Sequence, residues 1–125
     1  MKVGIIGCGN LGVALAKGIR AKHHDLPIYC SKRNINSIAD LQSDRTTVTA
    51  DNKLVLAQCD LIILALKPYT ILDFVKEHAQ SFDAKRHTIV SVATGVQLSE
   101  MKAQLPSGGW SLCRARPNTG AGGAE

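Results

Sequence analysis

The feature that most constrains the fold is a Gly-x-Gly-x-x-Gly pattern at residues 7–12. It directly follows an apolar run at Lys2–Ile6, a predicted strand, and opens a segment of helical period at Leu11–Ala21. In that context the first glycine allows a tight turn, the second lets a diphosphate approach the backbone, and the third lets the helix pack closely on the strand. Unpaired N–H groups at such a helix start attract phosphate. The alternative interpretation is a glycine-rich turn without a ligand.

The rest of the chain alternates short apolar runs with segments of helical period. Strands are predicted at Pro27–Cys30, Thr46–Thr49, Asp60–Ala65, Thr88–Ala93 and Ser111–Ala115. Helices are predicted at Ile35–Leu41, from an Asp51 cap to Gln58, at Thr70–Gln80 and at Leu98–Leu105. This order predicts an α/β fold of the Rossmann type, a doubly wound, mostly parallel sheet with helices on both faces. Residues 1–119 would form this domain, and residues 120–125 a flexible tail or truncated linker.

Composition excludes several other classes of protein. The chain of 125 residues has room for one domain, and its net charge of +5 is dispersed, which argues against a nucleic-acid surface. The four cysteines show no Cys-x-x-Cys spacing, so neither a metal site nor a disulfide framework is expected. The longest apolar run, Leu61–Leu66, is too short to cross a membrane, and a reducing cytoplasm is the default location.

The end of the second predicted strand indicates which dinucleotide would bind. Domains that prefer NAD carry an acidic residue there, which takes the ribose 2′-hydroxyl. Here Ser31, Lys32 and Arg33 follow the strand instead. A hydroxyl can donate a hydrogen bond to a 2′-phosphate and the cations can neutralise it, so NADP(H) is favoured, with NADH possible. Alternatively, the two cations are solvated residues of a turn.

Ligands of such sheets bind beyond the carboxyl ends of the strands. There, Asn52 could reach the adenosine, and the Pro68 turn could bring backbone groups near the nicotinamide ribose. Ala93 and Thr94 are followed by a glycine, and this small segment could let a ring pass close. For Lys67, a cofactor contact and an ordinary surface lysine are equally supported. His23 and His24 are expected in solvent at the opposite edge.

Together these motifs resemble the N-terminal domain of the pyrroline-5-carboxylate reductases over nearly the whole chain. The resemblance rests on residues 7–12, 31–33, 51–52, 65–68, 91–96 and 114–119. It implies an NADPH-dependent oxidoreductase of proline biosynthesis that transfers hydride to the imine 1-pyrroline-5-carboxylate and forms L-proline. The full set of candidate cofactor-binding residues, from the motifs and the resemblance, is Ile6, Gly7, Cys8, Gly9, Asn10, Leu11, Gly12, Ser31, Lys32, Arg33, Asn52, Ala65, Leu66, Lys67, Pro68, Ala93, Thr94 and Asn118.

The sequence departs from the family pattern in two respects. Arg116 stands where an apolar residue is expected, and Gly120 where the family has a second proline. The chain also lacks the C-terminal helical domain that forms the family's dimer and grips the substrate, so no catalytic residue is assigned. We therefore expect little reductase activity from this chain alone, and self-association through exposed apolar surface is plausible.

Two other functions fit the same motifs. One is a non-catalytic NADP-binding or sensor module, which the two departures favour. The other is a related Rossmann reductase that uses a deazaflavin, or another imine or hydroxy-acid substrate. The Pro117-Asn118-Thr119 segment is the main argument against the latter.

Overall fold

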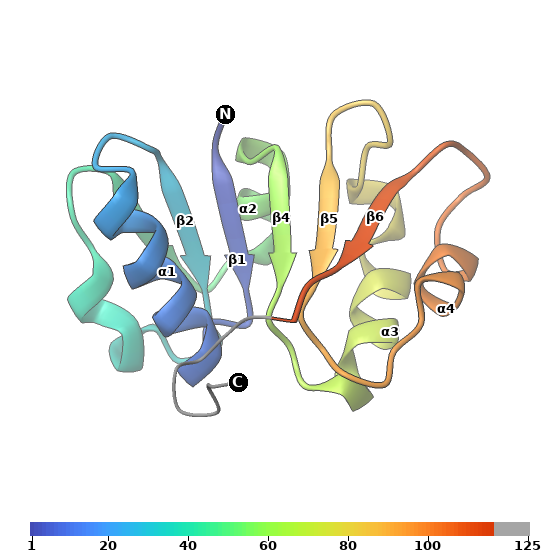
Figure 1. The fold of residues 1–125 in the computed structure, drawn as a ribbon, viewed down its shortest axis with the longest axis horizontal. Coiled ribbons are helices and arrows are strands. Elements are labelled where there is room, and N and C mark those ends of the chain that lie inside the picture. The colour runs from blue at the N-terminus through green and yellow to red at the C-terminus, as the bar shows by residue number, and fades with distance from the viewer. Residues whose placement is uncertain (117–125) are drawn as a thin grey trace.

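A single six-stranded sheet organises the computed structural model, which describes residues 1–116 (Figure 1). The strands are β1 (Val3–Ile6), β2 (Ile28–Ser31), β3 (Thr46–Thr49), β4 (Leu61–Leu64), β5 (Thr88–Ser91) and β6 (Ser111–Arg114). They lie in the order β3-β2-β1-β4-β5-β6, and every neighbouring pair is parallel. The predicted Rossmann-type α/β fold is confirmed.

Helices cover both faces of this sheet (Figure 1). The helical segments are α1 (Asn10–Lys22), the 3-10 segment η1 (Ile35–Leu41), α2 (Asn52–Gln58), α3 (Pro68–Glu77), the 3-10 turn η2 (Ala79–Ser81) and α4 (Leu98–Ala103). Residues of α1 and η1 pack in one buried cluster, and residues of α2, α3 and α4 pack in the other. The sheet is therefore doubly wound, as its strand order requires.

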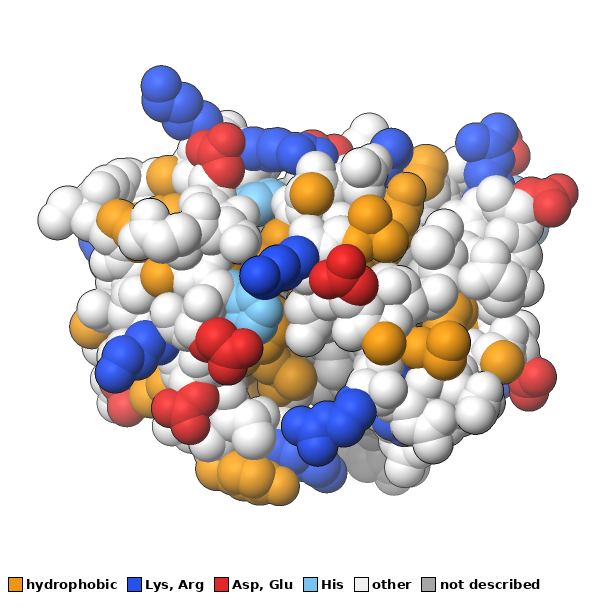
Figure 2. All heavy atoms as spheres, turned by 180° about the vertical axis from the view of Figure 1, so that it is seen from behind, with side chains coloured by type: hydrophobic (Ala, Val, Ile, Leu, Met, Phe, Trp, Pro, Cys, Tyr) orange, Lys and Arg blue, Asp and Glu red, His pale blue; other side chains and the backbone are white. Residues whose placement is uncertain are grey.

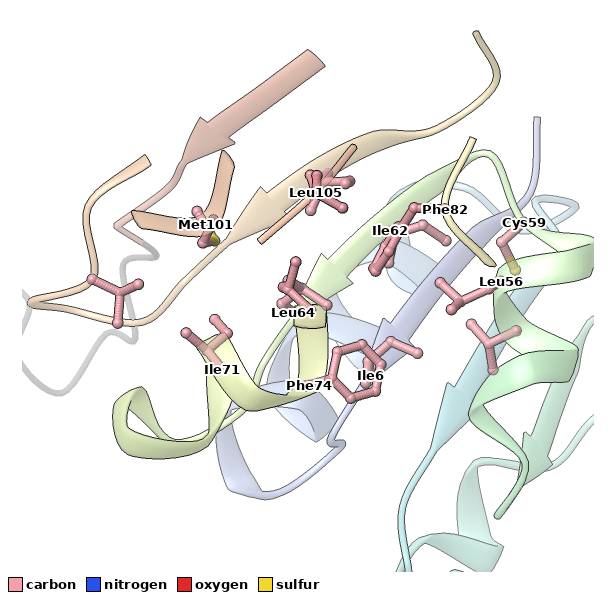
Figure 3. Close-up of a cluster of buried hydrophobic side chains, with 14 residues drawn as sticks. Ile6, Leu56, Cys59, Ile62, Leu64, Ile71, Phe74, Phe82, Met101 and Leu105 are labelled. Carbon is pink, nitrogen blue, oxygen red and sulfur yellow. The ribbon is translucent and has the colours of Figure 1, made fainter. Parts of the chain in front are cut away.

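The core consists of aliphatic side chains that alternate between the two faces of the strands. Along β4, Ile62 and Leu64 enter the cluster under α3 (Figure 3). Ile63 enters the cluster under α1. Figure 3 also shows Ile71 and Phe74 of α3 directed toward the same strands. Each such side chain stabilises the fold by about 1.5–3 kcal/mol when fully buried. Continuous apolar strands are thus explained by burial on both faces.

Glycine at one core position lets a helix lie directly on the sheet. A Cβ on Gly4, in the middle of β1, would meet Cγ1 of Val55 in α2 at 2.4 Å. The sequence alone did not single out this glycine. Its small size allows the close approach of α2 to β1, where any larger residue would not fit without movement of its neighbours.

Some elements differ from their predicted form. The segment Ile35–Leu41 is a 3-10 helix rather than an α-helix, because Ile38 has non-helical angles (φ −125°, ψ 15°) while its side chain is buried. Helix α3 begins at Pro68, two residues earlier than predicted, since proline suits the first helical position. The predicted contact of Asn118 and the predicted tail at residues 120–125 lie outside the described residues.

Other expectations concern the histidines and the cysteines. His23 and His24 are both exposed, as expected. Cys8, Cys30 and Cys59 are buried and Cys113 is exposed, and all four are free thiols. Within residues 1–116, no helix combines the length and apolar character needed to cross a bilayer.

Candidate functional site

The glycine turn after β1 is fixed by the neighbouring strand. Gly7 has a φ of +77°, a backbone conformation that favours glycine. The N–H groups of Gly7 and Cys8 donate to the carbonyl oxygen of Ser31, at 3.1 and 2.7 Å. Gly9 then donates to the carbonyl of Gly7 at 2.7 Å. These bonds hold the turn at the carboxyl end of β1, where the strand order reverses between β1 and β4.

The start of α1 faces open space. Its N-cap is Gly9, no side chain in the described part of the molecule caps it, and its first turn holds no acidic residue. A Cβ on Gly9 would have one neighbour within 4 Å among the described residues, the carbonyl oxygen of Gly7 at 4.0 Å. The backbone there is accessible and the helix dipole is not neutralised, which fits a bound anion such as a diphosphate.

The third glycine of the pattern serves packing. A Cβ on Gly12 would lie 3.1 Å from Sγ of Cys8 and 3.3 Å from Cγ2 of Ile5 in β1. Both distances are tighter than ordinary contacts between side chains. Gly12 therefore lets α1 approach β1, which is the role its place in the pattern predicts.

Two adjoining hollows open beside the turn. The first, here called the loop hollow, has a volume of about 780 Å³. It is lined by Gly7, Gly9, Asn10, Leu11, Lys32, Arg33, Ala65, Leu66, Lys67, Pro68, Thr70, Val92, Ala93 and Thr94. Twelve of these fourteen residues were predicted from the sequence as cofactor contacts. The carboxyl ends of β1, β2, β4 and β5 thus bring the predicted residues to one place.

The second hollow, here called the helix hollow, has a volume of about 480 Å³. It shares Gly7, Lys32, Arg33, Leu66 and Thr70 with the loop hollow and adds Ala50, Asn52, Asp73, Phe74, Glu77 and His78. Figure 2 shows a furrow on this side of the molecule, with histidine in its wall, apolar side chains at its floor and basic side chains at its lower end. The two hollows together form one elongated depression that starts at the glycine turn.

Ser31 lies between the glycine turn and Asn52, and it lines neither hollow. It is the last residue of β2, its side chain is fully buried, and its hydroxyl donates to Oδ1 of Asn52 at 2.6 Å. Lys32 is half-buried and tied to β3 by its N–H, which donates to the carbonyl of Thr49 at 3.2 Å, whereas Arg33 is exposed. Of the other predicted residues, Ile6, Cys8 and Gly12 are buried under the turn and line neither hollow.

Sequence reasoning missed one wall of the helix hollow, formed by α3. Thr70, Asp73, Phe74, Glu77 and His78 line it. Their spacing of three or four residues places them on one helix face, a pattern that could have identified the wall once Pro68 was taken as the helix start. The ring of His78 stacks on Phe74, with centroids 4.2 Å apart, and its Nδ1 donates to the carbonyl of Phe74 at 3.1 Å.

The charges around the depression are separated. Lys32 and Arg33 lie at the carboxyl end of β2, and Asp73 and Glu77 project from α3.

A hydrogen bond from the Cys30 thiol lowers the pKa of Cys8, whereas the same bond and burial raise the pKa of Cys30. Among residues 1–116, no three His, Cys, Asp or Glu side chains group closely enough to hold a metal ion.

Comparisons with known proteins agree with this geometry. Residues 2–95 match the family described as NADP oxidoreductase coenzyme F420-dependent. Over 94% of its length the chain is 34% identical to pyrroline-5-carboxylate reductase 3 of Danio rerio, of which it covers 41%. The chain therefore spans less than half the length of this relative.

Solved structures show the same fold. A pyrroline-5-carboxylate reductase of Coxiella burnetii superposes with a TM-score of 0.85 at 24% identity, over 94% of this chain and 44% of that one. A pyrroline carboxylate reductase of Plasmodium falciparum, solved with NADP bound, superposes with a TM-score of 0.69 at 18% identity, over 86% of this chain and 38% of that one.

Proposed function

This chain belongs to the NADP oxidoreductase coenzyme F420-dependent family, and it corresponds to the N-terminal NADP-binding domain of pyrroline-5-carboxylate reductases. From this premise we propose that the chain binds NADP(H) in the depression beside its glycine turn. The observation that carries the proposal is the uncapped start of α1, which opens into a hollow lined by twelve of the residues predicted from the sequence.

The diphosphate would lie at the start of α1. The first-turn N–H groups and the helix dipole favour negative charge there, and the missing side chain of Gly9 leaves the necessary room. The adjoining turn is held by Ser31 through backbone hydrogen bonds, so it is shaped before a ligand arrives. Such preorganisation reduces the ordering cost of binding.

The adenosine half would lie toward the helix hollow, with its 2′-phosphate near Lys32, Arg33 and Asn52. Ammonium, guanidinium and amide N–H groups are all donors, and they suit phosphate oxygens. A carboxylate, which NAD-binding domains place after this strand, is absent at residues 31–34. The preference for NADPH over NADH follows from this donor set.

The nicotinamide half would lie over the ends of β4 and β5. The Lys67-Pro68 turn and the small residues Ala93 and Thr94 line this part of the loop hollow. When bound, the cofactor supplies a hydride, and these residues would orient the ring that carries it. The substrate class carried over from the relatives is a cyclic imine, 1-pyrroline-5-carboxylate, which would be reduced to L-proline in the complete enzyme.

The family description supports a second candidate. It names coenzyme F420, a deazaflavin, and its match spans residues 2–95, the region that contains every residue lining the two hollows. A chain of this kind could therefore exchange hydride between NADP and a deazaflavin. Reduction of a deazaflavin by NADPH in the complete protein, without turnover of pyrroline-5-carboxylate, would favour this candidate.

Calorimetric titration with NADPH tests the proposed cofactor site. A Gly9→Ala substitution should leave the fold unchanged, because its Cβ would meet only a carbonyl oxygen at 4.0 Å among the described residues, yet weaken NADPH by about tenfold or more, since it occupies the diphosphate's space. Gly18→Ala, on the exposed side of α1, is the matched control and should bind as the unmodified chain does. No heat with NADPH, or equal binding by Gly9→Ala, would refute the proposed site.

A further inference from the structure

The hydrogen bond between Ser31 and Asn52 engages one end of the asparagine side-chain amide. The separation of 2.6 Å between Oγ and Oδ1 lies in the range of O–H···O bonds, and it is shorter than N–H···O bonds usually are. The hydroxyl of Ser31 is therefore the donor and the carbonyl oxygen of Asn52 the acceptor. The amide nitrogen of Asn52 is turned away from Ser31.

This orientation decides what Asn52 can offer to a ligand. The residue is half-buried and lines the helix hollow beside Lys32 and Arg33. With its oxygen engaged by Ser31, the amide presents Nδ2, which only donates. All three side chains at the end of β2 and the start of α2 are then donors. The carboxylates that line the same hollow, Asp73 and Glu77, come from a different element, α3.

We propose that Ser31 is a positioning residue, which selects 2′-phosphorylated dinucleotides by holding the amide nitrogen of Asn52 toward the hollow. The inference rests on the proposed NADP(H) site. A phosphate accepts hydrogen bonds at every oxygen, so a wall of donors suits it, whereas a ribose hydroxyl finds no acceptor for its own proton there. Without the Ser31 hydroxyl, the amide can rotate and turn its oxygen toward the phosphate.

The backbone and the side chain of Ser31 have separable roles. Its carbonyl accepts from Gly7 and Cys8 and so holds the glycine turn, whatever its side chain. A Ser31→Ala substitution removes only the hydroxyl from a fully buried site and keeps these backbone bonds. Asn52 can be truncated independently, because the N-cap of α2 is Asp51, whose side chain accepts from the N–H of Lys53 at 3.0 Å.

The test is a double-mutant cycle read by calorimetric titration of NADPH and NADH. Ser31→Ala should weaken NADPH by about tenfold, the equivalent of one hydrogen bond, and change NADH by less than about twofold. Ser31→Thr, which retains a hydroxyl, should recover most of the lost NADPH affinity. In an Asn52→Ala background, Ser31→Ala should cause no further loss, because its effect passes through Asn52.

Three results would overturn the positioning role. An equal loss of NADPH and NADH affinity would indicate a structural effect on the turn. A full loss from Ser31→Ala in the Asn52→Ala background would indicate a direct contact between Ser31 and the cofactor. An unchanged NADPH affinity in Ser31→Ala would show that the amide needs no such support. Failure of the unmodified chain to bind NADPH would instead refute the cofactor site itself, and the inference with it.

Discussion

Leu66, after β4, lies directly against Gly7, after β1: a Cβ on Gly7 would meet Cδ2 of Leu66 at 2.4 Å. The two residues are distant in sequence but adjacent where the strand order reverses. Their contact forms the boundary between the loop hollow and the helix hollow, since both residues line both depressions. The turn is thus shaped by its own positive φ and by a neighbour that leaves no room for a side chain.

A Gly7→Ala substitution should therefore damage both stability and binding. The left-handed conformation alone costs an alanine about 1–2 kcal/mol, and displacement of Leu66 adds to this. We expect a lower free energy of unfolding in urea and a loss of NADPH affinity. Gly18→Ala is the control: it lies in α1 with nothing within 4 Å among the described residues, and should stabilise the fold by about 0.5–1 kcal/mol. Equal stability of Gly7→Ala and the unmodified chain would contradict this account.

Arg33→Ala should weaken NADPH selectively. A charge-assisted hydrogen bond contributes about 1.5–3 kcal/mol, so the loss should be about tenfold or more for NADPH, with little change for NADH. Arg45→Ala removes the same charge just before β3, at the amino ends of the strands, and controls for net charge. Titrations at two salt concentrations measure both effects. If Arg33→Ala binds NADPH as before, the guanidinium does not contact the 2′-phosphate.

Thiol labelling should report the burial of the cysteines. Cys113 is exposed on β6, whereas Cys8, Cys30 and Cys59 are 0% exposed. Burial also raises the pKa of Cys59 to about 12, which keeps that thiol protonated and unreactive. Iodoacetamide at neutral pH should add one group to the native chain and four to the unfolded chain, as counted by mass spectrometry. A native chain of Cys113→Ser that still gains a group would show that the core opens readily.

The stability of the fold should fall in acid partly through Asp60. The N–H of Lys2, at 2.9 Å from Oδ2, and the Arg86 guanidinium, at 3.1 Å from Oδ1, lower the pKa of this carboxyl below its ordinary value of 3.8. The ionised carboxylate of Asp60 adds to the free energy of unfolding at pH values above 3.8, and this contribution is lost as the pH falls through the lowered pKa. The contribution is below about 1 kcal/mol because the pair is partly exposed and screened by solvent.

An Asp60→Asn variant should consequently be less stable than the unmodified chain at pH 6 and should approach it at pH 2. Urea denaturation at several pH values measures the difference. Asp44→Asn provides the control, since the side chain of this exposed aspartate forms no hydrogen bond or ion pair within residues 1–116. A difference between Asp60→Asn and the unmodified chain that stays constant with pH would argue against the electrostatic origin.

The isolated chain should show little or no reduction of pyrroline-5-carboxylate by NADPH. Orientation of two reactants can supply about 7–11 kcal/mol of a barrier, and with the proposed cofactor bound this depression would provide only one side of a cleft. The chain spans 41% of the length of its Danio rerio relative. NADPH oxidation, followed by absorbance with and without substrate, measures the activity. Turnover at ordinary enzyme rates would show that these residues suffice for catalysis.

Much of the site could be predicted because it depends on local patterns. The glycine spacing after an apolar run identified the turn, and the cations after the second run identified the candidate phosphate contacts. The wall formed by Asp73, Phe74 and His78 escaped prediction, because only the tertiary structure brings this face of α3 into one hollow with residues after β2 and at the start of α2. The 3-10 form of η1 was also missed, since tertiary burial of Ile38 overrides local helical preference.

The sequence by itself determined the order of strands and helices and the position of the glycine turn, because apolar period and glycine placement act over a few residues. Only the tertiary structure decided that the Ser31 hydroxyl is buried and donates to the side-chain carbonyl of Asn52, 21 residues away. Such a contact depends on how the end of β2 meets the start of α2. Parallel pairing in a fixed register sets that meeting, and no local pattern encodes it.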